Sequence, residues 1–389
     1  MHEAKRGIIR ALFQLFQHTS SVKSQTFLEF LVLSMCQQDE LQAVVARLRS
    51  AKIYPPYERF IETYRYVESL CKIKRRCRKA LSKQTKTAQL LQEKFLNNLP
   101  NTTQLETLRA ELTVQPGLNL EDKIVQYWHQ GSTFAKAQQN HGPWGIMQCL
   151  SNVSIERFYA DSRLILDADS IVDYIAFPKD VKDKLTRLKK LPLLSDLIRT
   201  AFLFCYGGTW LDFTILLLNK IPSYCLDKEV FYFIRDGELE INSLHYKDIK
   251  QRFIAHSPYY FGWDDSFKVN MFSCLIHAKV GNILLGTLLS VLFKFVREED
   301  PREYEYFVYM ILFDLLLDTS QFNHLKSEFT QGIPSDACCH ILQVFDYKRF
   351  NEKLYDEICA KYPVQKLNGG CRLIKGALLY ETLRRQQLL

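Results

Sequence analysis

The chain has 389 residues, of which 47% are hydrophobic and 24% are charged, a balance typical of a globular protein with a substantial core. No run reaches the about 18 apolar residues that a membrane-spanning helix needs, so no transmembrane helix is predicted. The 11 cysteines include no CxxC pair and no signal peptide precedes them, so we expect reduced thiols in a cytoplasmic protein.

Residues 1–119 are predicted to form a helical, basic region. There is no glycine between Gly7 and Gly117, and apolar residues recur at the three- and four-residue spacing of amphipathic helices. The stretch from Lys72 to Lys86 holds basic residues and no acidic one. It is either a solvated helix face or a surface for anionic lipid headgroups at the inner face of a membrane. Nucleic acid is not expected as a partner, because no aromatic residue interleaves the basic ones.

Residues 120–389 are predicted to form an α/β domain, because β-type and helical segments alternate there. The predicted strands are 123–131, 155–161 and 229–235, and the predicted helices are 145–152, 179–190, 282–295 and 303–317. His277 lies in an apolar run and is predicted to be a core residue. The cluster Cys338–His340 is not predicted to bind zinc, because adjacent side chains seldom converge on one metal.

The central predicted element is a helix that leads into a buried strand through two glycines. Pro192 and Ser195 suit a helix start, and Gly207-Gly208 suits its end because glycine adopts the left-handed conformation without steric cost. Residues 209–218 are nearly all apolar, aromatic or β-branched, which predicts a single strand buried on both faces.

Two polar pairs lie on this helix and strand. Asp196 and Arg199 are three residues apart and share a helix face, whereas Asp212 and Thr214 are two apart and point to one side of the predicted strand. Asp212 is the only charge between Tyr206 and Leu218, and a buried unpaired carboxylate is costly. We therefore expect it to meet a metal, an arginine or several donors. Either pair alone is compatible with a structural role, but both together around a glycine turn indicate a functional site.

The runs 195–199 and 206–214 resemble the core of the capsular polysaccharide synthesis protein family. That family is grouped with the DXD-motif, sugar-binding glycosyltransferases, which include clostridial glucosylating toxins and yeast mannosyltransferases. The resemblance implies a GT-A-like nucleotide-sugar-binding domain with a mixed central sheet. It also implies a divalent cation, Mn²⁺ or Mg²⁺, bound through Asp212 and Thr214, although the threonine replaces the second aspartate of the motif.

Three further segments resemble the same family. Residues 123–131 match its opening strand, 269–282 match a segment whose asparagine touches the donor sugar, and 364–370 match a closing loop at the diphosphate. The resemblance implies donor-binding roles for Tyr127, Trp128, Ser195, Asp196, Arg199, Gly208, Trp210 and Lys366. It implies catalytic roles for Asp196, Arg199, Asp212 and Asn270. The loop 257–265 is rich in aromatic rings and carboxylates, and its Trp263, Asp264 and Asp265 are candidates for the acceptor side.

The predicted function is therefore transfer of a sugar from a UDP- or GDP-sugar to a glycan or lipid-linked acceptor in surface or capsular polysaccharide synthesis, with retention of configuration. Two alternatives stay open. One is a non-catalytic membrane- or nucleic-acid-binding protein on a degenerate transferase fold. The other is a different metal-dependent, nucleotide-using transferase, although the sequence contains no GxxxxGK[ST] phosphate loop.

Overall fold

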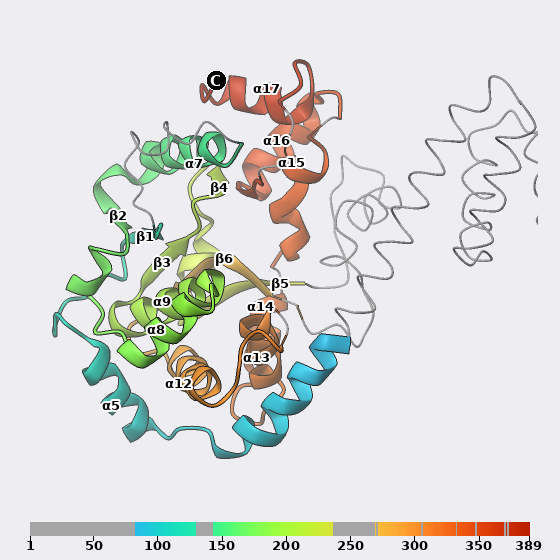
Figure 1. The fold of residues 1–389 in the computed structure, drawn as a ribbon. Helices are drawn as coiled ribbons and strands as arrows, with labels where there is room; N and C mark the ends of the chain where they lie inside the picture. The colour runs from blue at the N-terminus through green and yellow to red at the C-terminus, as the bar shows by residue number, and fades with distance from the viewer. Residues whose placement is uncertain are drawn as a thin grey trace, which may run out of the picture. The chain divides into compact units, whose positions relative to one another are not determined.

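The computed structural model describes residues 82–129, 143–235, 269, 271–304, 306–331, 333–346, 348–368, 371 and 373–389. All of them belong to the compact unit Ala80–Leu389. The helices predicted before residue 82, Asn270 and the predicted acceptor residues Trp263, Asp264 and Asp265 lie outside the described residues. The described residues form an α/β fold with a mixed central sheet, which confirms the predicted fold class (Figure 1).

The central sheet has five strands in the order β2-β1-β3-β6-β5. β1 pairs in parallel with both β2 and β3, and β6 pairs antiparallel with both β3 and β5. The strands are β1 (Ile124–Tyr127), β2 (Arg163–Leu166), β3 (Gly208–Leu211), β5 (Val230–Ile234) and β6 (Met271–Ala278). Parallel strands need crossover connections, and the helices that make them cover the two faces of the sheet.

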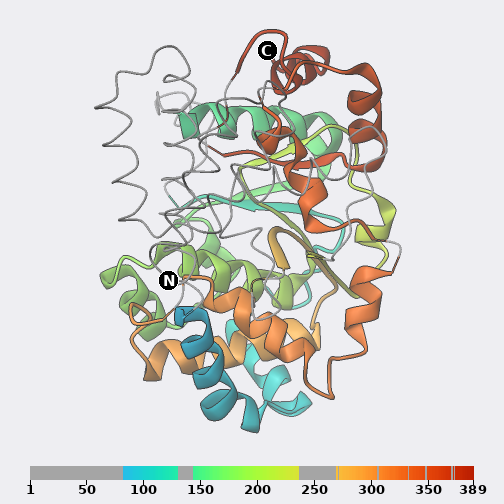
Figure 2. The same cartoon turned by 90° about the vertical axis from the view of Figure 1, so that its right-hand side faces the viewer.

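One face of the sheet packs on a layer of helices that Figures 1 and 2 show below it. These helices are α5 (Thr102–Leu112), α8 (Lys179–Arg187), α9 (Leu191–Tyr206), α12 (Ile283–Glu298) and α13 (Val308–Leu317). Val125, Trp210 and Ile276 point into this core, as alternate positions of their strands should. α9 and α12 approach closely at Gly286, which has no side chain. A Cβ atom there would lie only 2.6 Å from Cε2 of Phe204.

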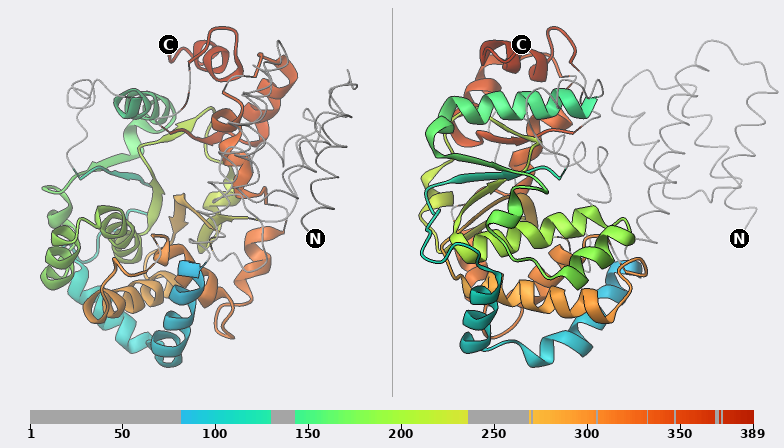
Figure 3. Two further views of the ribbon diagram at one scale, coloured as in Figure 1. Left: turned by 45° about the vertical axis from the view of Figure 1, so that its right-hand side comes forward. Right: turned by 60° about the vertical axis from the view of Figure 1, so that its left-hand side comes forward.

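The opposite layer contains α7 (Pro143–Tyr159), a two-stranded ribbon and the carboxy-terminal helices, as the two views of Figure 3 show. The ribbon pairs β4 (Ile215–Leu217) antiparallel with β7 (Val364–Lys366). Ile215 and Leu217 pack toward the central sheet, whereas Leu216 and Leu218 pack toward the carboxy-terminal helices. The remaining helices are α10 (Ser223–Leu226), α14 (Leu325–Thr330), α15 (Ile341–Val344), α16 (Glu352–Lys361) and α17 (Leu378–Arg385).

The structure confirms the central helix and its glycine ending. α9 ends at Tyr206, and Gly207 and Gly208 have φ angles of 70° and 108°. A Cβ atom at Gly208 would lie 2.7 Å from the carbonyl oxygen of Leu120, so glycine is required there for both conformation and space.

Two predicted strands are wrong. Residues 209–218 are not one strand: β3 ends at Leu211 and β4 begins at Ile215, whose N–H donates to Asp212 O at 3.0 Å across the intervening turn. The apolar run is continuous because both strands are buried, although they belong to different sheets. Residues 155–161 are not a strand either, because α7 extends to Tyr159, and Ile155 and Tyr159 are spaced as neighbours on one helix face.

Two predictions concern membranes. Within the described residues, no helix has the length and apolar composition to span a bilayer. Of the basic stretch, only Lys83 and Lys86 are described. Lys86 Nζ lies 3.8 Å from Glu303 Oε2 and 5.0 Å from the ring centre of Tyr304, so this lysine has an acidic and an aromatic partner within the unit Ala80–Leu389.

Candidate functional site

The order of the parallel strands identifies one end of the sheet as a place for a ligand. The chain leaves β1 through α7 in one layer, and it reaches β3 from β2 through α8 and α9 in the other layer. β1 and β3 are neighbours in the sheet, so the connections diverge to opposite faces between them. Ligands of open α/β sheets bind at such a switch point, outside the carboxyl ends of the strands. Trp128 follows β1 there, and Asp212 follows β3.

Four charged side chains meet next to this switch point. Arg199 Nη2, on α9, lies 3.3 Å from Asp196 Oδ1 and 3.4 Å from Asp212 Oδ1. Lys366 Nζ, at the end of β7, lies 3.3 Å from Asp212 Oδ2. We call Asp196, Arg199, Asp212 and Lys366 the charged cluster. Its two acidic and two basic members alternate, so its formal charge is balanced.

Arg199 is held in place by the sheet. Its guanidinium donates to the backbone carbonyl of Ser273 on β6 and lies 5.6 Å from the ring centre of Trp210 on β3. Trp210 Nε1 in turn donates to Asp212 Oδ1 at 3.3 Å. The Arg199 side chain is only 7% exposed, so its charge is fixed beneath the surface of the site rather than free in solvent.

The β4–β7 ribbon brings Lys366 to the cluster. Lys366 is opposite Ile215 in the ribbon, and Leu367 N–H donates to Thr214 O at 2.9 Å. Lys366 Nζ also donates to the hydroxyl of Thr214. The Asp212 N–H donates to Cys274 O at 2.9 Å, which ties the turn after β3 to β6.

The environment shifts the pKa values of the cluster. Burial opposes ionisation of Asp212, but Arg199 and Lys366 outweigh it and hold the pKa of Asp212 below its usual value. Burial alone would lower the pKa of Lys366, but interactions with Cys274 and Asp212 raise it above the usual value. Burial raises the pKa of Asp196 to about 6, against the opposing effect of Arg199. At neutral pH the ionised forms of all four groups therefore predominate.

Tyr306 lies near the cluster, a position that the sequence does not predict. The residue is 55% exposed, yet its pKa is raised by burial and then by the charge of Asp196. Asp212 also raises the pKa of Tyr306, whereas Arg199 and Lys366 lower it, each with a smaller effect. The hydroxyl is therefore within electrostatic range of the whole cluster. No motif marks Tyr306 in the sequence. Its segment, 303–317, is predicted only to form a helix.

The predicted aromatic residues lie around the same end of the sheet. Tyr127 and Trp210 are both buried, with ring centres 6.2 Å apart. Trp128 is partly exposed and packs edge-on against Phe213, with ring centres 6.0 Å apart. Trp128 is therefore the more accessible of the two predicted residues at the end of β1.

The two remaining predicted donor-binding residues lie at different distances from the cluster. Ser195 is half-buried and directly precedes Asp196 on α9. Gly208 begins β3, pairs with Ala278, and is enclosed by the backbone of Leu120 and Lys123, so it lies at the other end of the strand from Asp212.

The charged cluster is a poor fit for the divalent cation that the resemblance implies. Within the described ranges, no group of three His, Cys, Asp or Glu side chains is placed to hold a metal ion. Both carboxylate oxygens of Asp212 face cations, and the Thr214 hydroxyl accepts from Lys366. Mn²⁺ and Mg²⁺ instead prefer several oxygen ligands with unneutralised charge.

His277 is a core residue, as predicted. Its Nδ1 lies 2.9 Å from Thr209 Oγ1, and burial lowers its pKa.

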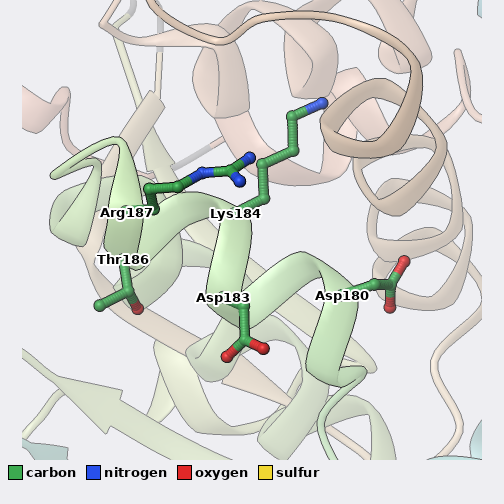
Figure 4. A pocket seen from close by; sticks show the side chains of 5 residues that line it. All are labelled: Asp180, Asp183, Lys184, Thr186 and Arg187. Atoms are coloured by element: carbon green, nitrogen blue, oxygen red, sulfur yellow. The ribbon is translucent and has the colours of Figure 1, made fainter.

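A hollow along α8 lies apart from the charged cluster and contains none of its members (Figure 4). Its side chains tie α8 to the end of α12: Lys184 Nζ donates to Glu299 O at 2.9 Å, and Arg297 Nε donates to Asp180 Oδ2 at 2.6 Å. The lining residues are Asp180, Asp183, Lys184, Thr186 and Arg187. The packing of α8 against the end of α12 therefore explains this hollow.

Comparison with known proteins gives one family. The family model described as capsular polysaccharide synthesis protein matches residues 70–376, which include the sheet, the charged cluster and all the described helices of both layers except α17. No curated protein and no solved structure matches the chain.

Proposed function

Because the chain belongs to the capsular polysaccharide synthesis protein family, we propose that it is a glycosyltransferase. In this proposal it moves a sugar from a nucleotide-sugar donor, a UDP- or GDP-sugar, to a glycan or lipid-linked acceptor on a GT-A-like domain. The observation that carries the proposal is the charged cluster beside the switch point between β1 and β3. A donor with a diphosphate and a polyhydroxylated sugar needs both fixed cations and carboxylates, and the cluster supplies both.

The cations of the cluster would act on the leaving group. When the bond between the anomeric carbon and the diphosphate oxygen breaks, negative charge develops on that oxygen. A positioned cation stabilises this charge more in the transition state than in the ground state, which lowers the barrier. Lys366 is suited to this role because its side chain is 20% exposed and held beside Asp212.

The carboxylates would orient the donor. Asp196 is 16% exposed and forms an ion pair with Arg199 through one oxygen, so its other oxygen is suited to a hydroxyl of the sugar or ribose. Asp212 would keep Arg199 and Lys366 aligned. Fixing the anomeric carbon in this way converts binding energy into correct geometry for the reaction.

The proposed stereochemical course is retention. No side chain is assigned as a covalent nucleophile, so the acceptor hydroxyl would attack the anomeric carbon from the face that the diphosphate leaves. The new bond joins the acceptor oxygen to the anomeric carbon, the old carbon–oxygen bond breaks, and the acceptor proton goes to the departing phosphate oxygen. Trp128 and Tyr306 offer partly exposed rings beside the site for stacking on the nucleotide base or a sugar face.

The test is calorimetric titration of the full chain with a panel of UDP- and GDP-sugars, followed by analysis of the products. We expect one donor to bind and to be cleaved at the sugar–phosphate bond, and Asp212→Asn to abolish cleavage. Asp318→Asn is the matched control, because Asp318 also pairs with a lysine, Lys326, but at the surface. Cleavage between the phosphates would instead indicate a nucleotidyltransferase.

An anionic membrane surface stays a proposed partner of the stretch Lys72–Lys86.

A further inference from the structure

Lys366 has the position and the partners that a metal ion would need. Its ammonium group lies 3.3 Å from Asp212 Oδ2 and donates to the hydroxyl of Thr214, the two residues that stand at the ends of the Asp-x-Thr sequence. The other oxygen of Asp212 faces Arg199 Nη2 at 3.4 Å and Trp210 Nε1 at 3.3 Å. The ligand atoms that the sequence offers to a cation are thus already bound to protein cations and donors.

The backbone around Lys366 holds this ammonium group in place. The side chain of the preceding residue, Gln365, is fully buried and makes three hydrogen bonds: it accepts from Leu342 N–H at 3.0 Å and donates to the carbonyls of Cys338 and Tyr362, each at 2.8 Å. Leu367 is also buried and bonds to the Thr214 carbonyl. A lysine between two such anchors is a fixed charge, unlike a lysine on a solvated helix.

A divalent ion added to this arrangement would be repelled. It would have to share one carboxylate with an ammonium and a guanidinium group, both within 3.4 Å of that carboxylate. The cluster would then carry a formal charge of about +2 rather than zero, and the Asp-x-Thr sequence would supply only one carboxylate and one hydroxyl as ligands. Displacement of Lys366 would in turn leave its ammonium group without its partners, which is costly for a group that is only 20% exposed.

We propose that Lys366 replaces the divalent cation, so that the donor diphosphate binds to this chain without metal. The inference rests on the proposed function, since it concerns the same site. The interactions of Lys366 are with one anion, Asp212, one hydroxyl, Thr214, and one thiol, Cys274. A phosphate oxygen is a stronger acceptor for an ammonium group than a hydroxyl or a thiol is. A diphosphate therefore replaces the Thr214 hydroxyl and the Cys274 thiol as partners of the Lys366 ammonium group, while Asp212 keeps Lys366 in position.

Two measurements on the full chain test this inference. The first follows free Mn²⁺ by electron paramagnetic resonance, with Mn²⁺ alone as the probe. The second is titration with UDP and with GDP, once in EDTA and once in Mn²⁺. We expect no Mn²⁺ binding tighter than about 1 mM, and nucleotide affinity that is equal in the two buffers. Tight Mn²⁺ binding, or nucleotide binding that requires Mn²⁺, overturns the inference and leaves the proposed function intact.

Variants of Lys366 give a second readout. Lys366→Met should weaken nucleotide binding by about tenfold or more, whereas Lys366→Arg, which keeps the charge, should stay within about tenfold of the wild type. Lys326→Met is the control, because Lys326 also pairs with an aspartate but is 48% exposed. Unchanged affinity of Lys366→Met overturns the inference. If Lys366→Met does not fold, Lys366→Arg and the comparison of EDTA with Mn²⁺ decide. Absence of nucleotide binding in both buffers contradicts the proposed function itself.

Discussion

Lys366 Nζ and Asp212 Oδ2 lie 3.3 Å apart, although the two residues are separated by 154 positions in the sequence. The contact joins the turn after β3 to the end of β7, and it depends on the pairing of β4 with β7. The central sheet and the carboxy-terminal region thereby share one charged cluster. Any change that loosens the ribbon should therefore disturb the site, even if it touches none of the four charged residues.

Removal of the Asp212 charge should reduce both stability and activity. In Asp212→Asn, Lys366 loses its carboxylate, and Arg199, which is 7% exposed, keeps Asp196 as a carboxylate partner but loses the charge of Asp212. Loss of one partner from a buried ion pair typically costs about 3–5 kcal/mol, and the partial exposure of Asp212 reduces this to about 2–4 kcal/mol. Urea denaturation at neutral pH measures the change. In the surface control Asp318→Asn, the loss should stay below about 1 kcal/mol, and equal losses in both variants would contradict the role of the cluster.

A methyl group at Gly208 should destabilise the fold far more than one at Gly117. Both glycines have positive φ, 108° and 85° respectively, so alanine is strained at either position. Only at Gly208 would the new Cβ atom also meet backbone, at 2.7 Å from Leu120 O, whereas nothing lies within 4 Å of it at Gly117. We expect Gly117→Ala to cost about 1–2 kcal/mol and Gly208→Ala to cost about 3 kcal/mol or more. Denaturant midpoints of the two variants, compared directly, check the difference.

Asp196 should make the protein less stable as the pH rises. Its pKa is about 6 in the folded chain against an ordinary 3.8, so the folded state binds the proton more tightly than the unfolded state does. This stabilising contribution is complete below pH 3.8 and is lost as the pH rises through 6. The free energy of unfolding of wild type relative to Asp196→Asn should therefore fall over this range, by at most about 3 kcal/mol.

Asp180 provides the control for this pH dependence. Its hydrogen bond to Arg297 lowers its pKa, so its contribution has the opposite sign and is lost only as the pH falls below 3.8. The difference between wild type and Asp180→Asn should thus stay flat where the Asp196 difference changes. Parallel curves for the two variants would show that the pKa of Asp196 is not raised.

The sequence predicts the centre of this site well because the strongest local signals coincide there. A helix start at Pro192, two glycines and a lone charge in an apolar run each have a direct physical meaning. The expectation that Asp212 meets an arginine or several donors is confirmed by Arg199, Trp210 and Lys366. The role of Lys366 as a partner of Asp212 and Thr214 was not foreseen, because it depends on a pairing between β4 and β7 that leaves no local mark.

The two wrong strand predictions and the absence of Tyr306 from the predicted site have a related origin, because they depend on tertiary structure that local composition does not show. The turn at Asp212–Thr214 divides an apolar run whose two halves are buried in different sheets, and hydrophobicity alone does not distinguish them. The end of α7 was mistaken for a strand because its aromatic and β-branched residues also suit a strand, and only their spacing favours a helix. Tyr306 was missed because its proximity to the cluster is a tertiary relationship.

Tyr306 should contribute to donor binding but not to stability. Its ring is more than half exposed, so Tyr306→Ala should leave the free energy of unfolding within about 0.5 kcal/mol of the wild type. Loss of a stacking ring typically costs about 1–3 kcal/mol, so the donor dissociation constant should rise by about tenfold. Tyr306→Phe keeps the ring and separates stacking from the hydroxyl, whose pKa is raised by burial and by the charge of Asp196. Calorimetry of both variants with the donor identified for the wild type measures the effect. Equal weakening in the two variants would assign the contribution to the hydroxyl, and no weakening in Tyr306→Ala would remove Tyr306 from the site.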